Sequence, residues 1–278
     1  MTIQRSQASR AGGIRAETRL SLEVLHRAGG PLTVERAATL LGTDTAHARR
    51  LLAYLARRGW LARVRRGMYT PVPLDANLSG QWSEDVWLAA TITFAPCYIG
   101  GWSALEHWGL TEQLFRTVIV FTSKRVRHRD ADFQGTSVRL KVVAPGKLFG
   151  IQKVWRRQGQ VSVSDPSRTI VDALDEPAVA GGMRHVAGAV AEYFASDYRN
   201  DMLLVEYGDR LGNRAVFKRL GYLLELLNIA APELLDACRE RRSSGLAALD
   251  PSVKAKGHIV RRWGLRVNVD VADVEAWS

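Results

Sequence analysis

The sequence predicts an α+β protein in which an N-terminal winged helix-turn-helix domain is followed by a larger mixed α+β domain. Three observations support this fold class. Two helical patterns and a basic hairpin follow one another within residues 33–70. The excess of arginine ends near residue 78, and the later sequence places its strands before most of its helices.

The helix-turn-helix is predicted from apolar spacing on both sides of the turn Gly42-Thr43-Asp44. Gly42 suits the left-handed conformation that ends many helices. Residue 43, 44 or 45 offers a side-chain oxygen to the first turn of the second helix, which ends before Gly59. The apolar faces comprise Val34, Ala37, Ala38, Leu40 and Leu41 in the first helix and Ala48, Leu51, Leu52 and Leu55 in the second.

A basic β-hairpin, the wing, follows the second helix. Residues 60–64 alternate as a strand, Arg65-Arg66-Gly67 forms the turn, and residues 68–70 return. In this fold the second helix enters the major groove of DNA, and we expect the wing to lie along the backbone. A winged helix that contacts protein and a solvated arginine face are the alternatives. The expected DNA contacts are Thr45, His47, Arg49, Arg50, Tyr54, Arg57, Arg63, Arg65 and Arg66.

The charge of the chain is unevenly distributed over its 278 residues, which have a formal net charge of +11. Residues 1–80 contain 13 Arg, no Lys and 5 acidic residues, a net charge of +8. The other 198 residues contain 26 basic and 23 acidic residues, a net charge of +3. This asymmetry is expected when only the first domain meets a polyanion. The arginine bias suits phosphate and guanine recognition, although a GC-rich genome would produce the same bias.

Three segments are expected along the chain. They are a flexible basic arm over residues 1–16, the winged helix-turn-helix domain over residues 17–78 and the α+β domain over residues 79–278. The arm either reaches into a minor groove or is simply disordered. Residues 17–28 predict a helix that braces the helix-turn-helix through Leu20, Val24 and Leu25.

The second domain is expected to begin with both helices and strands and to continue into a long helical region. Ser83 is expected to cap a helix that ends at residue 94, and the capping box Ser103-Ala104-Leu105-Glu106 is expected to open another. Asp165 and Pro166 begin a further helix. A basic loop is expected over residues 124–129, strands over 118–121, 137–144, 154–155, 161–163 and 267–269, and helices over 182–195, 200–211, 213–227 and 231–241.

The sequence gives little support to catalysis. Asp172 and Asp175 lie three positions apart on one helix, where capping or surface solvation explains them better. Residues 100–103 with Asp130 and Asp132 are weakly similar to a nucleotidyltransferase, whose carboxylates hold Mg²⁺, but these two acids lie in a polar stretch. We therefore predict no enzymatic activity and no cofactor.

The remaining composition predicts a cytoplasmic protein. Cys97 and Cys238 lie far apart in apolar surroundings without metal-ligand spacing, so we expect buried free thiols. The N-terminus lacks the apolar run of a signal peptide, and no segment approaches the length of a membrane-spanning helix. We therefore expect no contact with a membrane.

Four blocks follow one another in a defined order. They are the winged helix with its ending Gly67-Met68-Tyr69, residues 98–113 (YIGGWSALEHWGLTEQ), residues 164–172 (SDPSRTIVD) and residues 219–225 (RLGYLLE). Together they resemble the AbiEi-type antitoxins of type IV toxin–antitoxin (abortive infection) systems. The resemblance extends over residues 17–270 of the chain.

The resemblance implies a bacterial DNA-binding repressor that binds inverted repeats in its own promoter and autoregulates its operon. It also implies an antitoxin that neutralises a nucleotidyltransferase-like toxin, which need not form a stable complex with it. A monomer and a cooperative pair induced by DNA both fit the sequence. The alternative is a winged-helix regulator whose C-terminal domain binds a small ligand or has nucleotidyltransferase-like activity.

Overall fold

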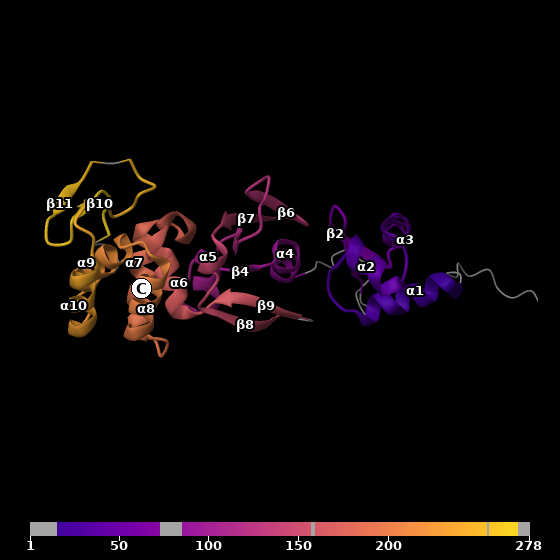
Figure 1. Ribbon diagram of the computed structural model, residues 1–278, viewed down its shortest axis with the longest axis horizontal. Helices are drawn as coiled ribbons and strands as arrows, with labels where there is room; N and C mark the ends of the chain where they lie inside the picture. Colours follow the sequence, from indigo (N-terminus) through magenta and orange to yellow (C-terminus); the bar gives the residue numbers. More distant parts are fainter. Residues whose placement is uncertain (1–15, 73–84, 157–158, 255, 272–278) are drawn as a thin grey trace, which may run out of the picture. The chain divides into compact units, whose positions relative to one another are not determined.

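A computed structural model describes residues 16–72, 85–156, 159–254 and 256–271 (Figure 1). The chain divides into two compact units, Met1–Glu84 and Asp85–Ser278, which are described separately below. The expected arm, up to residue 15, and the expected boundary near residue 78 lie outside the described residues.

The first unit combines three helices with a three-stranded antiparallel sheet of order β1-β3-β2. This order of elements is that of the predicted winged helix-turn-helix. Strand β1 was not predicted, because two residues are too few to show alternation. The elements are α1 (Ala16–Arg27), β1 (Leu32–Thr33), α2 (Val34–Leu41), α3 (Thr45–Arg57), β2 (Leu61–Arg65) and β3 (Met68–Pro71).

Local hydrogen bonds define both ends of the α2–α3 turn. Gly42 has a φ of 61°, and its N–H donates to backbone carbonyls of α2, as predicted for the end of that helix. Asp44 is the cap of α3, because its Oδ1 accepts a hydrogen bond of 2.8 Å from the N–H of His47. The predicted turn is therefore confirmed, and the cap is the second of the three candidates.

The core of the first unit lies between the three helices and the sheet. Helix α1 contributes Leu22 and Leu25, whereas Leu20 is 63% exposed and Val24 37% exposed. The predicted face of α1 was therefore wrong for two of its three residues. Two residues along a helix turn the side chain by about 200°, so a helix that buries Leu22 directs Leu20 and Val24 to the opposite side.

The second unit is built on a six-stranded sheet of order β6-β7-β5-β4-β9-β8. Strand β5 pairs with β7 in parallel, β4 pairs with β9 in parallel, and the remaining neighbours are antiparallel. The strands are β4 (Cys97–Ile99), β5 (Val118–Thr122), β6 (Asp130–Phe133), β7 (Thr136–Val142), β8 (Ile151–Arg156) and β9 (Gly159–Ser164).

Helices cover both faces of this sheet. Figure 1 shows α4 (Val86–Phe94) on one side of the strands and α5 (Gly101–His107) and α6 (Pro166–Asp175) on the other. Beyond α6, four helices pack with it into the largest hydrophobic core of the unit. They are α7 (Met183–Ala195), α8 (Asp201–Leu211), α9 (Ala215–Leu226) and α10 (Pro232–Arg241). The predicted strands-then-helices order is confirmed.

A small sheet completes the second unit. Strand β12 (Leu265–Val267) pairs in parallel with β10 (Ala247–Ala248) and antiparallel with β11 (His258–Val260). The strand predicted over 267–269 therefore begins and ends two residues earlier. The ring of Trp263 is buried against Gly221 of α9, which joins this sheet to the helical core.

Two predicted helix starts in the second unit need correction. Helix α4 is capped by Asp85, which accepts from the N–H groups of Trp87 and Leu88, and Ser83 lies outside the described residues. Helix α5 begins at Gly101, so the predicted capping box lies inside it, and Ser103 Oγ instead accepts from the N–H of Ile119 in β5. In addition, residues 130–133 form the edge strand β6, which was not predicted.

Candidate nucleic-acid interface

Helix α3 presents a polar and basic stripe opposite its buried face. Ala48, Leu52 and Leu55 are fully buried against the core of the first unit. Because a helix turns once every 3.6 residues, the intervening positions point away from that core. The exposed side chains of α3 include Thr45, His47, Arg49, Arg50, Tyr54 and Arg57.

His47 and Arg50, two of the expected DNA contacts, lie in the first two turns of α3 close to an acidic cap. The hydrogen bond from the His47 N–H lowers the pKa of the Asp44 carboxyl, and the charge of Arg50 acts in the same direction. Asp44 is therefore a carboxylate that fixes the start of the helix. His47 and Arg50 extend from the two turns that follow this cap.

A contact between a guanidinium group and an aromatic ring lies at the C-terminal end of α3. The guanidinium carbon of Arg58 lies 5.7 Å from the centre of the Tyr54 ring, within the range of a cation–π interaction. Arg58 also forms the C-terminal cap of the helix. Tyr54 and Arg57 are both exposed beside it.

The wing is a β2–β3 hairpin with a β-bulge. Arg63 pairs with Tyr69 and Arg65 pairs with Met68, so one extra residue lies between the two pairs on β2. Gly67 has a φ of 78°, and its carbonyl accepts from the N–H of Val34 at the start of α2. The wing turn is therefore attached to the helix-turn-helix.

The arginines of the wing differ in exposure. Arg63 and Arg66 are exposed, whereas Arg65 is half-buried with one guanidinium nitrogen inaccessible to solvent. A side chain that contacts DNA is expected to be exposed, and Arg65, which lies at the bulge, is the one expected contact that is half-buried. Eight of the nine predicted contact residues are exposed, and all nine lie on α3, β2 or the wing turn.

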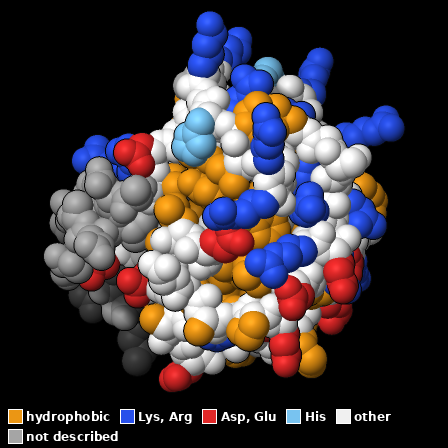
Figure 2. All heavy atoms as spheres, turned by 90° about the vertical axis from the view of Figure 1, so that its left-hand side faces the viewer, with side chains coloured by type: hydrophobic (Ala, Val, Ile, Leu, Met, Phe, Trp, Pro, Cys, Tyr) orange, Lys and Arg blue, Asp and Glu red, His pale blue; other side chains and the backbone are white. Residues whose placement is uncertain are grey.

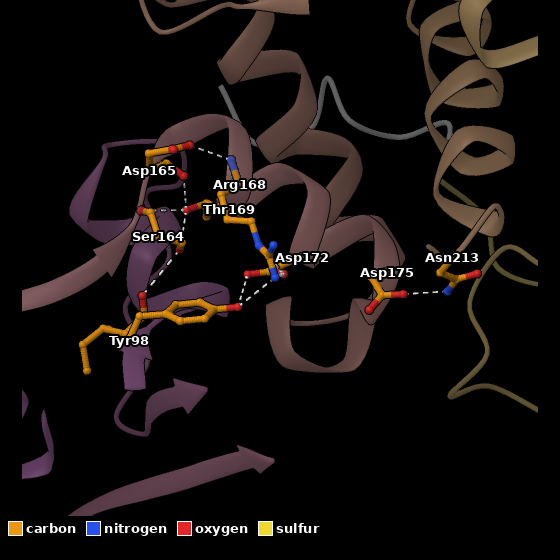
Figure 3. Close-up of polar contacts among 9 residues, drawn as sticks. Tyr98, Ser164, Asp165, Arg168, Thr169, Asp172, Asp175 and Asn213 are labelled. Carbon is orange, nitrogen blue, oxygen red and sulfur yellow. Dashed lines mark hydrogen bonds and ion pairs between the residues drawn. The ribbon is translucent and has the colours of Figure 1, made fainter. Parts of the chain in front are cut away.

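The second unit contains a buried polar network around α6 (Figure 3). Arg168 donates from Nε and Nη2 to Asp172 Oδ1, at 3.0 and 2.9 Å, and from Nη2 to the Tyr98 hydroxyl at 3.1 Å. The Tyr98 hydroxyl in turn donates to Asp172 Oδ2 at 2.8 Å. Arg168 and Asp172 are 1% and 2% exposed.

This network corrects the interpretation of Asp172 as a capping or surface residue. Burial raises the pKa of Asp172, while the charge of Arg168 acts in the opposite direction. Burial and the charge of Asp172 raise the pKa of the Tyr98 hydroxyl. Asp175 is half-buried and accepts a hydrogen bond of 2.6 Å from Asn213. A charged pair four positions apart between apolar residues was the only sequence signal for this site.

The network begins at the cap of α6. Asp165 Oδ1 accepts from the N–H of Arg168 at 2.8 Å, and Asp165 Oδ2 accepts from the Tyr207 hydroxyl of α8 at 2.9 Å. The predicted start of α6 at Asp165 and Pro166 is therefore confirmed. Ser164 accepts from the indole N–H of Trp108 through its carbonyl and shares a 2.7 Å hydrogen bond with Thr169.

The C-terminal end of α6 is held by a residue from α9. Arg219 is 4% exposed and donates to the carbonyls of Leu174 and Asp175, as well as to those of Ala248 and Leu249. A cation at this position complements the negative end of the helix. Residues 98–113, 164–172 and 219–225, which supported the resemblance, thus meet around one helix.

Asp130 and Asp132, the carboxylates of the nucleotidyltransferase alternative, accept hydrogen bonds from residues close to them in the chain. Asp130 accepts from Arg139 at 3.3 Å, and Asp132 accepts from the N–H of Gly135 at 3.1 Å. Both lie on the edge strand β6 and are exposed. Among the described residues, no group of three or more His, Cys, Asp or Glu side chains could hold a metal ion. Cys97 and Cys238 are buried and free, as predicted.

The surface of the second unit has further basic regions. Figure 2 shows a face on which apolar side chains are exposed between Lys and Arg side chains. The exposed apolar residues of the unit include Leu246 and Ile259, and Arg261 and Arg262 follow the latter in sequence. The predicted loop between β5 and β6 exposes Lys124, Arg125, Arg127, His128 and Arg129.

No helix within the described ranges has both the length and the apolar character needed to cross a membrane.

The chain is similar to known proteins in its fold and in one segment of its sequence. Among solved structures, it is similar to the crystal structure of the RV2827C protein from Mycobacterium tuberculosis, with a TM-score of 0.63 and 17% sequence identity over 95% of each chain. At this identity the similarity establishes the fold alone. No curated protein matches the chain.

Residues 19–72 match the family model described as "Transcriptional regulator, AbiEi antitoxin". The matched segment extends from α1 to the residue after β3, so it contains the complete helix-turn-helix and wing. The match agrees with the resemblance inferred from the sequence over residues 19–72, and it supports a role as a regulator or antitoxin. Residues 19–72 of this chain are thus similar to the AbiEi antitoxin family of transcriptional regulators.

Proposed function

We propose that this protein is a DNA-binding repressor of its own operon and the antitoxin of a nucleotidyltransferase-like toxin. The observation that supports DNA binding best is the exposed stripe of α3, whose basic residues lie in the segment that matches the family. Arg49, Arg50 and Arg57 belong to this stripe, and Arg63 and Arg66 are exposed on the wing. The proposal includes no enzymatic activity and no cofactor.

The two parts of the surface have different roles in this proposal. His47 and Arg50 lie early in α3, where the side chains of a recognition helix reach base edges in the major groove. Arg66 lies at the wing turn, where a guanidinium group contacts phosphates and fixes the orientation of the protein. The operator is expected to be an inverted repeat bound by two copies of the chain.

DNA binding is tested with the full chain and duplex DNA from upstream of its gene in gel-shift titrations. Binding should weaken by about tenfold or more between 50 and 200 mM salt, because each neutralised phosphate releases counterions. Random DNA of the same length is the control and should bind less tightly at every salt concentration. Affinity that does not change with salt, or equal affinity for both duplexes, would contradict a sequence-specific repressor.

The antitoxin role is supported by the family match and assigned to the second unit, which has its own sheet and its own core. We propose that the neutralised protein is the product of a neighbouring gene and that neutralisation does not require a stable complex. Co-expression of the chain with that product from independent promoters should restore growth. Growth arrest at full expression of both proteins would exclude the antitoxin role.

A further inference from the structure

The outer face of α1 carries apolar side chains that the core of the first unit does not use. Leu22 and Leu25 pack into that core, whereas Leu20 is 63% exposed and Val24 is 37% exposed. Single exposed apolar residues are common on protein surfaces. Leu20 and Val24, however, lie four positions apart and therefore form neighbours on one side of the helix. Both side chains are available to another molecule.

Two charged residues extend this apolar pair into a stripe. Glu17 lies three positions before Leu20, Arg27 lies three positions after Val24, and both are exposed. Each residue of a helix turns the side chain by about 100°, so the four positions fall within about 80° of one another. The spacing of three, four and three residues is that of a coiled-coil contact. We call Glu17, Leu20, Val24 and Arg27 the α1 stripe.

The two ends of the α1 stripe carry opposite charges. Within the part of the chain that the structure describes, neither Glu17 nor Arg27 forms an ion pair. Arg19 and Glu23, on the flank of the helix, pair with each other at 3.5 Å. The α1 stripe therefore has one anionic end and one cationic end around an apolar centre.

This order of charges is complementary to a second copy of the same helix in the antiparallel direction. When Leu20 faces Val24 of the second copy, two-fold symmetry also places Val24 against Leu20. The same register places Glu17 against Arg27 at each end of the contact. In a parallel pair in register, Glu17 would face Glu17 and Arg27 would face Arg27, and like charges repel. Charge therefore favours the antiparallel pair.

We propose that the α1 stripe is a contact surface between two antiparallel copies of this chain. Leu20 and Val24 form its apolar centre, and Glu17 and Arg27 form an ion pair at each end. Stable protein interfaces have about 20–30 residues from each partner, so a contact of this size is transient in free solution. Two copies held next to each other on DNA reach a much higher effective concentration, at which a weak contact is populated.

The symmetry of this contact relates it to the proposed operator. An isologous contact has a two-fold axis, and an inverted repeat has the same symmetry. Pairing through α1 should therefore help two copies to bind an inverted repeat together. This consequence rests on the proposed function, whereas the contact itself is tested without DNA, so either can fail without the other.

The contact is tested by disulfide trapping between two variants of the full chain, Leu20→Cys and Val24→Cys. Cys97 and Cys238 are buried, so the introduced cysteine is the accessible thiol. Under mild oxidation an equal mixture should give more mixed disulfide than the statistical share, because positions 20 and 24 face each other in the antiparallel register. Mass spectrometry separates the mixed dimer from the two homodimers. Leu40→Cys, at an exposed apolar position on α2, replaces Leu20→Cys in the control mixture and should give only the statistical share.

Charge reversal tests the ion pairs at the two ends. With Glu17→Arg in both cysteine variants, an arginine faces Arg27 at each end, and trapping of the mixed dimer should slow by about fivefold or more. With Glu17→Arg in one chain and Arg27→Glu in the other, every facing pair again has opposite signs. Trapping should then recover to the rate of the cysteine variants alone or exceed it.

A control separates these facing charges from a general attraction between oppositely charged chains. Glu233→Arg in one chain and Lys254→Glu in the other make the same changes in net charge at exposed positions of the second unit. At about 0.15 M salt the effect of distant charges is screened, so this pair should trap at the rate of the cysteine variants alone. Circular dichroism verifies that all variants are folded.

Four results would overturn the proposal. A statistical share of mixed disulfide would mean that the two helices have no preferred register. A predominance of disulfides between two Leu20→Cys chains would indicate a parallel pair. Unchanged trapping with Glu17→Arg in both chains would remove the ion pairs. A Leu20→Cys thiol that does not react with a small thiol reagent in the folded protein would mean that another part of the same chain covers the α1 stripe.

Discussion

The effect of substituting an ion-paired arginine in this protein depends more on the burial of the pair than on its charge. Arg168 and Arg199 both pair with an aspartate, but Arg168 and Asp172 are buried, whereas Arg199 and Asp201 are about one-third exposed. Water solvates the second pair after one partner is lost, and it cannot reach the first. The two pairs should therefore respond very differently to the same substitution.

Arg168→Met should lower the free energy of unfolding by about 3–5 kcal/mol, because it leaves Asp172 buried without its cation. Arg199→Met, the matched surface change, should cost about 1 kcal/mol or less. Urea unfolding followed by circular dichroism measures both. Adding Asp172→Leu to Arg168→Met should recover part of the loss, and a double variant less stable than the single one would contradict this account.

The DNA-contact residues lead to a second prediction at this scale. Arg50→Ala should cost about 1–3 kcal/mol of binding free energy on the operator and much less on random DNA, because base contacts discriminate between sequences. Arg66→Ala should weaken binding to both duplexes about equally, because phosphates are present in every sequence. Gel-shift affinities on the two duplexes measure this. Equal losses for Arg50→Ala would show that Arg50 contacts only the backbone.

At the scale of elements, two glycines within helices separate packing from conformational freedom. A Cβ atom on Gly221 of α9 would overlap the ring of the buried Trp263, whereas a Cβ on Gly188 of α7 would meet no atom within 4 Å. The first glycine permits close approach of α9 to the residues before β12. Gly188 has free space around its Cα atom, so an alanine side chain fits there without displacing a neighbour.

Gly221→Ala should therefore destabilise the second unit by about 1–3 kcal/mol, the usual cost of an overpacked core. Gly188→Ala should stabilise it by about 0.5–1 kcal/mol, because alanine restricts the unfolded chain and suits a helix interior. Chemical denaturation of the two variants measures the difference. A Gly221→Ala variant that is as stable as the wild type, or more stable, would mean that Trp263 can move away without cost.

At the scale of the whole molecule, each unit has its own hydrophobic core. A unit with its own core can keep its fold when its neighbour is altered. Arg50, Arg63 and Arg66 are exposed, so their removal should not disturb the core of the first unit.

The triple change Arg50→Ala, Arg63→Ala and Arg66→Ala should abolish repression while leaving rescue from the toxin intact. Repression is measured with a promoter reporter and rescue with growth in co-expression, and circular dichroism verifies the fold. Arg199→Ala, a charge loss in the second unit, is the control and should preserve repression. A folded triple variant that fails to rescue would show that neutralisation needs the basic face of the first unit.

The pH dependence of stability is another property of the whole chain. Burial lowers the pKa of His185, whose Nε2 lies 2.6 Å from Thr111 Oγ1. Burial also lowers the pKa of His107, and the charge of Arg156 adds to the effect. The native state then binds fewer protons than the unfolded state near and below the ordinary histidine pKa of about 6.5. Stability from these groups is present above that pH and is lost as the pH falls through the native pKa values.

The urea concentration at the unfolding midpoint should therefore decrease when the pH is lowered from 7.5 to 5.5. His185→Asn should show a smaller fall, because it removes one of the two groups. The comparison of wild type and variant at each pH cancels the contribution of carboxyl groups such as Asp165, whose pKa is raised by burial. An equal fall in both proteins would mean that His185 is protonated equally in the native and unfolded states.

Features that depend on residues close together in the chain could be predicted from the sequence. The α2–α3 turn follows from the left-handed Gly42 and the cap Asp44, and the start of α6 follows from Asp165 and Pro166. Each of these ends is fixed by groups within four positions, so a short stretch contains the necessary information. The roles of the nine residues proposed to contact DNA stay predictions from the same kind of local pattern.

Features that depend on groups far apart in the chain became apparent only in the folded protein. Helix α5 begins at Gly101, where a Cβ would overlap the carbonyl of Val179, and Ser103 Oγ inside α5 accepts a hydrogen bond from the N–H of Ile119 in β5. Asp172 is buried because Tyr98, 74 positions earlier, covers it together with Arg168. The conformational preferences of a short segment do not indicate such distant partners. The physical reason is that burial and pairing arise from packing between elements, which no spacing within one element specifies.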